Sequence, residues 1–221
     1  DRKFDKKVLR TKNRPIASGK VSVQLGLFYA SVLCILAFLV LINFNYFTII
    51  LALASMPLAF TYPLMKRFTY WPQLFLGITF NYGLILGWTS ISEQLDIIPF
   101  IFYFGAIFWT LGYDTIYGYQ DIQDDEIIGL KSTSIKFKGT EKSFLTICYL
   151  ILIFSLLIGG YQMNFNKYYY LFLILPISHL IFYQIRLFDS KNPNNCLKIF
   201  KSNNYFGLLI LISIFIGKNY L

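Results

Sequence analysis

The chain has 221 residues, of which 56% are hydrophobic and 14% are charged, and its formal net charge is +9. A soluble domain carries about 25% charged residues, so the composition argues against an ordinary soluble enzyme and for a membrane protein. Lysines and arginines occur in short stretches between apolar segments, which disfavours nucleic acid as a partner and predicts a lipid bilayer. The three cysteines show no CxxC spacing, so neither a disulfide framework nor a zinc site is predicted.

Seven segments are long and apolar enough, or nearly so, to cross a bilayer as helices, for which roughly 20 residues are needed. No alternation of period two persists through them, so strands are not expected. The fold class is therefore all-α, a multi-helix transmembrane bundle formed as one domain over residues 1–221. The predicted spans are 21–43, 46–63, 71–92, 97–113, 143–160, 168–186 and 205–217.

The charge pattern predicts how the bundle is oriented. With seven spans, eighteen of the twenty lysines and arginines fall on one face of the membrane. Positive charge marks the cytoplasmic side of a bacterial inner membrane, or the matrix side of a mitochondrial inner membrane. The segments on this face are 1–20, 64–70, 114–142 and 186–204.

Two acidic windows lie on that same face, at 1–5 and 114–126, and hold seven of the eleven acidic residues. Asp1 and Asp5 are four residues apart, as are Asp121 and Asp125, which places each pair on one face of a helix. Asp114 comes two helical turns before Asp121 on the same stripe. Paired carboxylates repel one another unless a cation lies between them, and Mg²⁺ typically takes one or two carboxylates plus substrate phosphates. We therefore predict a Mg²⁺ site.

Basic residues follow each acidic pair, which distinguishes this pattern from acidic residues that merely solvate a loop. Arg10 and Arg14 follow the first pair, and Lys131 follows the second. A diphosphate needs both metal and cationic contacts, because its charge must be neutralised when it leaves. For each basic residue alone, contact with a lipid headgroup explains its position equally well.

Residues 1–19 resemble the first aspartate motif of the UbiA superfamily of intramembrane prenyltransferases, and residues 113–133 resemble the second. Segments 62–73 and 196–208 look most like the branch that uses 4-hydroxybenzoate. The resemblance implies a fold of nine transmembrane helices, of which this chain would supply the third to the ninth. The chain would then lack the first helix and most of the second. It also lacks the Asn and the earlier Asp of the first motif, so one complete and one partial metal site are expected.

The resemblance implies Mg²⁺-dependent transfer of a polyprenyl group from polyprenyl diphosphate to 4-hydroxybenzoate, ortho to its hydroxyl, in ubiquinone synthesis. The planar fork of Arg67 suits the acceptor carboxylate, although a positively charged anchor at the end of a span would look the same. Asp114 could bind metal or orient the acceptor. The implied metal ligands are Asp1, Asp5, Asp121 and Asp125, the implied catalytic residues are Asp114, Asp121, Asp125 and Arg67, and the implied substrate-binding residues are Arg10, Arg14, Lys66, Arg67 and Lys131.

Several other interpretations remain open from the residues. A prenyltransferase of the same superfamily could use homogentisate, dihydroxynaphthoate or haem as its acceptor, and the segment around Lys66 and Arg67 argues against these. A membrane cation transporter would place carboxylates near the bilayer midplane, whereas these cluster at one face. A membrane scaffold leaves the paired carboxylates unexplained. Within the third span, Gly77, Gly83 and Gly87 are predicted to allow close helix packing, with room for substrate as the second interpretation.

Overall fold

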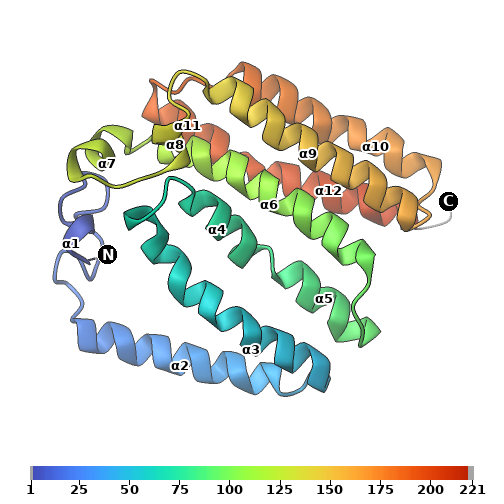
Figure 1. Cartoon of the computed structure of the whole chain (residues 1–221), viewed down its shortest axis with the longest axis horizontal. Helices are drawn as coiled ribbons and strands as arrows, with labels where there is room; N and C mark the ends of the chain where they lie inside the picture. The colour runs from blue at the N-terminus through green and yellow to red at the C-terminus, as the bar shows by residue number, and fades with distance from the viewer. Residues whose placement is uncertain (1, 219–221) are drawn as a thin grey trace.

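The computed structural model describes residues 2–218, except for the side chain of Lys3. Between these residues the chain forms helices and no strands, and seven helical segments are long and apolar enough to cross a bilayer. Both observations confirm the predicted all-α transmembrane bundle (Figure 1). The seven segments are α2 (Val23–Leu41), α3 (Tyr46–Thr61) with η1 (Tyr62–Arg67), α4 (Pro72–Phe80) with α5 (Gly83–Ser92), α6 (Ile97–Gly118), α9 (Glu141–Gln162), α10 (Lys167–Ser178) with η2 (His179–Arg186), and α11 (Pro193–Lys201) with α12 (Asn203–Lys218).

Short helices gather at one end of the bundle. They are α1 (Arg2–Asp5), α7 (Ile122–Ile128) and α8 (Thr133–Lys136), and Figure 1 shows them with α11 at the same end. The chain between α1 and α2 lies at this end too. The side chains of Val8, Thr11 and Ala17 in this segment are buried, so the segment packs against the rest of the protein. The segments that carry most of the basic residues therefore meet at one end of the molecule, as the charge pattern predicted.

The third predicted span is interrupted, since α4 ends at Phe80 and α5 begins at Gly83. The buried side-chain amide of Asn81 lies at the break, where it donates to the Gly77 carbonyl at 2.8 Å and to the Ala106 carbonyl of α6 at 3.1 Å. It also donates to the Thr110 hydroxyl at 2.7 Å. In an apolar environment an unpaired amide is costly, so these bonds fix the break against α6.

The predicted close packing holds for one of the three glycines and is wrong for the other two. A Cβ added at Gly77 would lie 2.8 Å from the carbonyl oxygen of Ile107, so α4 and α6 approach each other at this point. A Cβ added at Gly83 or Gly87 would meet no described atom within 4 Å. Both line an open hollow between α5 and the far ends of α6 and α12 instead.

A chain of hydrogen bonds, largely buried, joins four helical segments of the bundle. The Tyr149 hydroxyl of α9 donates to the Gln184 side chain of η2 at 2.5 Å, and Gln184 donates to Asn203 of α12 at 2.7 Å. The indole N–H of Trp109, from α6, also donates to Asn203, at 2.8 Å. Satisfied polar networks of this kind rigidify a core, so α11 and α12 are held firmly against α6.

Candidate active site

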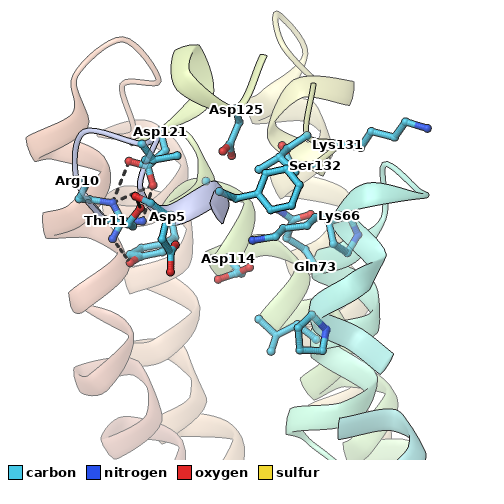
Figure 2. Close-up of a pocket in the computed structure, with 18 of the residues that line it drawn as sticks. Asp5, Arg10, Thr11, Lys66, Gln73, Asp114, Asp121, Asp125, Lys131 and Ser132 are labelled. Carbon is cyan, nitrogen blue, oxygen red and sulfur yellow. Dashed lines mark hydrogen bonds and ion pairs between the residues drawn. The ribbon is translucent and has the colours of Figure 1, made fainter. Parts of the chain in front are cut away.

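A cavity of about 310 Å³ opens at the end of the bundle where the short helices gather. Its walls come from the segment before α2, from η1, α4, α6 and α7, and from the loop before α8 (Figure 2). The residues lining it are Phe4, Asp5, Val8, Arg10, Thr11, Arg14, Tyr62, Pro63, Lys66, Pro72, Gln73, Leu76, Asp114, Tyr117, Gly118, Asp121, Asp125, Leu130, Lys131 and Ser132.

Four of the predicted acidic site residues line this one cavity. Asp5 ends α1, Asp114 lies in the last turns of α6, Asp121 immediately precedes α7 and Asp125 lies within it. The two acidic windows, more than a hundred residues apart in the sequence, therefore meet in space (Figure 2). Asp1, the remaining predicted ligand, lies outside the described residues.

The predicted continuous stripe from Asp114 to Asp121 is wrong, because α6 ends at Gly118 and α7 is a separate helix. Between them the chain turns, with Tyr119 buried and its ring centroid 5.5 Å from that of Phe188. The spacing from Asp121 to Asp125 does form a helical turn, since the Asp125 amide donates to the Asp121 carbonyl at 2.9 Å.

Arg10, which follows the first acidic window by five residues, contacts the second window directly. Its Nε donates to both carboxylate oxygens of Asp121, each at 2.9 Å, and a second donor, Nη2, also contacts this carboxylate. Its Nη1 donates to the Tyr117 hydroxyl at 2.7 Å. The Leu9 amide donates to the Asp124 carboxylate at 3.0 Å. Together these bonds hold the segment before α2 over the ends of α6 and α7.

A second ion pair joins Asp5 of the first acidic window to Arg14. Arg14 Nη1 approaches the carboxylate of Asp5 at 3.0 Å, and the Thr11 hydroxyl donates to the Asp5 carbonyl at 3.0 Å. The side chain of Asp5 is 17% exposed and that of Asp121 is 13% exposed, so both carboxylates are largely shielded from solvent. Charge-assisted hydrogen bonds compensate for that desolvation.

The electrostatics of the second window favour a bound cation. The pKa of Asp125 is raised to about 6, chiefly by burial and next by the neighbouring Asp121 carboxylate, whereas Lys66 and Arg10 act in the opposite direction. For Arg10, the hydrogen bond to Asp121 raises the guanidinium pKa. A carboxylate whose charged form is disfavoured gains stability when a cation enters the cavity beside it.

The predicted cationic residues differ in how they meet the cavity. Figure 2 shows the Lys66 side chain reaching into it, toward the side where Asp114 and Asp125 lie. The Lys131 ammonium instead donates to the Phe68 carbonyl at 3.2 Å and lies 5.5 Å from the centroid of the Tyr70 ring. Arg67 is exposed, and its guanidinium lies 5.0 Å from the ring centroid of Phe4, which itself lines the cavity. Arg67 thus stands at the rim.

Tyr117 and Gln73 are among the polar residues of the cavity that were not predicted from the sequence. Tyr117 follows Asp114 by three residues on α6, a spacing that places both on one helix face and could have revealed it. Gln73 is buried at the start of α4, where its side-chain oxygen Oε1 accepts a hydrogen bond from the Thr133 backbone amide at 3.0 Å. Nothing in the local sequence indicates that contact, which joins residues 60 positions apart.

The donor set fits a hard divalent cation bound together with a phosphate. Among the described residues, no three His, Cys, Asp or Glu side chains are close enough to form a complete metal site. Mg²⁺ does not require one, because it keeps several waters and takes its remaining ligands from substrate phosphates. Carboxylates on one side of the cavity and Lys66 reaching in from the other are the groups that such a complex needs.

The fold and the site define an integral membrane protein with a cavity lined by acidic and basic residues at one end of its helical bundle. Residues 1–211 match the model of the UbiA prenyltransferase family. The chain belongs to this family. It is therefore a membrane prenyltransferase, and the transporter and scaffold interpretations no longer apply.

Individual relatives and solved structures support the assignment to this family. The chain is 42% identical to 4-hydroxybenzoate geranyltransferase 2 of Lithospermum erythrorhizon, over 99% of this chain and 71% of that protein. It is also 42% identical to the mitochondrial 4-hydroxybenzoate polyprenyltransferase of Bos taurus, over 99% of this chain and 59% of that one. The apo structure of a UbiA homologue from Aeropyrum pernix K1 superposes with a TM-score of 0.85 at 21% identity, over 98% of this chain and 80% of the other. This last similarity supports the fold.

Proposed function

We propose that this protein transfers a polyprenyl group from polyprenyl diphosphate to the ring of 4-hydroxybenzoate, ortho to the hydroxyl, as a step of ubiquinone synthesis. The observation that carries the proposal is the meeting of four carboxylates and Lys66 around one cavity at the end of a membrane bundle. The choice of 4-hydroxybenzoate as the acceptor is supported by the relatives, which are named as 4-hydroxybenzoate prenyl-transferring enzymes.

Asp121 and Asp125, with Asp5 on the same side of the cavity, are the proposed ligands of Mg²⁺, and Asp1 completes the proposed set. The chemistry that Mg²⁺ supplies when bound is neutralisation of the charge that develops on the leaving diphosphate. Lys66 is the proposed diphosphate contact from the opposite wall, because its side chain reaches into the cavity. Arg10, Arg14 and Lys131 are further candidates, and of these Lys131 has its ammonium engaged at the rim.

The proposed reaction breaks the bond between the prenyl C1 and the diphosphate oxygen, and the electron pair stays on the diphosphate. The ring carbon ortho to the hydroxyl then bonds to C1, and its proton passes to the released diphosphate. Asp114 lines the same cavity as the metal-binding candidates, so it can bind metal or orient the acceptor. Arg67 is the proposed contact for the acceptor carboxylate, in keeping with its place at the rim beside Phe4.

The proposed location is the bacterial inner membrane, or alternatively the mitochondrial inner membrane. The cavity lies at the end of the bundle where most lysines and arginines gather. Positively charged loops remain on the cytoplasmic or matrix side, so we place the active site there.

A direct assay tests the proposal. Membranes carrying the product of the complete reading frame are supplied with a prenyl diphosphate, 4-hydroxybenzoate and Mg²⁺, and parallel reactions contain homogentisate, dihydroxynaphthoate or haem. The proposal predicts a prenylated 4-hydroxybenzoate that EDTA abolishes and excess Mg²⁺ restores. Product from another acceptor, with none from 4-hydroxybenzoate, would refute the assignment of the substrate.

A further inference from the structure

Tyr117 occupies a central position in the cavity wall although none of the predicted roles uses it. It lies in the last turn of α6, three residues after Asp114 and four before Asp121, and it lines the cavity. Its hydroxyl accepts the hydrogen bond from Arg10 Nη1 at 2.7 Å, and the guanidinium carbon lies 4.9 Å from its ring centroid. Tyr117 and Arg10 therefore make two kinds of contact with each other, one polar and one between cation and ring.

Arg10 thus has two attachments that respond differently to a bound cation. One is the carboxylate of Asp121, which a cation in the cavity would attract away from the arginine. The other is the neutral hydroxyl and ring of Tyr117, for which a cation competes far less. If Asp121 turns to a metal ion, Tyr117 still holds the guanidinium at the cavity wall.

The ring of Tyr117 packs against an aromatic ring of another helix. The ring of Phe200, from α11, lies with its centroid 4.5 Å from that of Tyr117. α11 and α12 are in turn held against α6 by the buried hydrogen bonds of Asn203. The hydroxyl of Tyr117 therefore has little freedom to leave Arg10, and its position is set before any ligand arrives.

We propose that Tyr117 is a positioning residue that keeps the Arg10 guanidinium directed at the diphosphate after Asp121 has turned to the metal ion. The inference rests on the proposed function, since it requires a diphosphate in the cavity. Because Arg10 then has a ready partner in the diphosphate, the loss of its bond to Asp121 does not leave its charge unpaired. Tyr117 acts through Arg10 and does not need to contact the reacting carbon.

A double-mutant cycle tests this proposal. Tyr117→Phe, Arg10→Met and the double variant are made in the product of the complete reading frame, and binding of inorganic pyrophosphate with Mg²⁺ is measured by calorimetry without acceptor. Loss of one hydrogen bond should weaken pyrophosphate binding about 5- to 10-fold in Tyr117→Phe. Arg10→Met should weaken it more, and the double variant should equal Arg10→Met.

In turnover, Tyr117→Phe should raise the KM for prenyl diphosphate and leave that for 4-hydroxybenzoate unchanged.

Tyr113→Phe is the matched control, because this tyrosine also lies on α6 and packs against Phe200 at 5.7 Å but is not among the residues lining the cavity. It should change pyrophosphate binding less than about 2-fold, because its side chain is not part of the cavity wall. Tyr117→Phe that weakens binding equally with and without Arg10, or not at all, would overturn the proposal.

Pyrophosphate binding and turnover measured on the wild-type protein distinguish failure of this inference from failure of the proposed function. Pyrophosphate binding without turnover of 4-hydroxybenzoate would overturn the acceptor assignment and leave the cycle interpretable, because the cycle uses no acceptor. Wild-type protein that binds no pyrophosphate in the presence of Mg²⁺ would overturn both proposals.

Discussion

Arg10 donates hydrogen bonds to both carboxylate oxygens of Asp121, which lies 111 positions later in the chain. This contact makes the segment before α2 a wall of the cavity, although that segment contains only a single short turn of helix up to Asp5. The site therefore combines the ends of membrane-spanning helices with the segment before α2 and the chain around α7, and its shape depends on how firmly these last two are joined. The pairing of Asp124 with the Leu9 amide is the second link between them.

Removing that second link should loosen the segment. Asp124→Ala leaves the Leu9 amide without its carboxylate acceptor, at a cost of about 1 kcal/mol for an exposed hydrogen bond. Limited proteolysis tracks the population of the open segment, so cleavage by trypsin within residues 6–20 should rise about 5-fold. Glu126→Ala is the control, because its exposed ion pair with Lys138 contributes little. Equal cleavage of both variants would contradict the assigned link.

The two lysines should differ in their contribution to pyrophosphate binding. Lys66→Met removes a cation whose side chain reaches into the cavity, and Lys131→Met removes one that contacts Phe68 and Tyr70 at the rim. A charged hydrogen bond contributes about 1.5–3 kcal/mol, so Lys66→Met should weaken binding about 10- to 100-fold. Lys131→Met should stay within about 2-fold. Calorimetry with Mg²⁺ present measures both, and a reversed order would show that the wrong lysine has been assigned.

Arg67 provides a test of the acceptor site. Arg67→Ala should raise the KM for 4-hydroxybenzoate about 10-fold or more and leave the KM for prenyl diphosphate nearly unchanged, because a guanidinium fork binds a carboxylate through paired hydrogen bonds. Initial rates measured with each substrate varied in turn provide both constants. If the constant for the diphosphate changed and that for 4-hydroxybenzoate did not, Arg67 would belong to the diphosphate site.

Glycine substitutions test the packing of the bundle separately from the site. Gly77→Ala places a methyl group 2.8 Å from the Ile107 carbonyl oxygen, so backbone must shift, at a typical cost of about 1–3 kcal/mol. Gly87→Ala, in open space within α5, should be neutral or stabilising by up to about 1 kcal/mol through helix propensity. Thermal unfolding in detergent compares the two. A Gly77→Ala protein as stable as the wild type would contradict the close approach of α4 and α6.

The spans were predictable because bilayer crossing requires long apolar helices, and this signal is local in the sequence. The interruptions within the spans could not be predicted from the sequence. The break between α4 and α5 depends on Asn81 bonding to Ala106 and Thr110 of another helix, and no local pattern specifies that partner. The extension of α6 to Gly118 was missed because Asp114 and the tyrosines around it are not apolar enough to be read as a span.

The meeting of the two acidic windows was predictable from their shared face and their resemblance to a family, and the structure brings Asp5, Asp121 and Asp125 into one cavity. The pairing of individual residues was not predictable. Arg10 contacts Asp121 and Arg14 contacts Asp5, whereas the sequence indicated only that basic residues follow acidic ones. Such pairings depend on how the loops turn over the end of the bundle, which the sequence does not encode locally.

The most direct test of the account compares two neighbouring residues of α7. Asp125 lines the cavity, whereas Glu126 forms an exposed ion pair with Lys138. Prenylation of 4-hydroxybenzoate is measured against Mg²⁺ concentration in Asp125→Asn and Glu126→Gln. Asp125→Asn should lower the maximal rate at least about 100-fold, the scale for loss of a preorganised charge contact, and Glu126→Gln should match the wild type. Near-normal turnover by Asp125→Asn at saturating Mg²⁺ would contradict the proposal that these carboxylates hold the metal ion and the diphosphate.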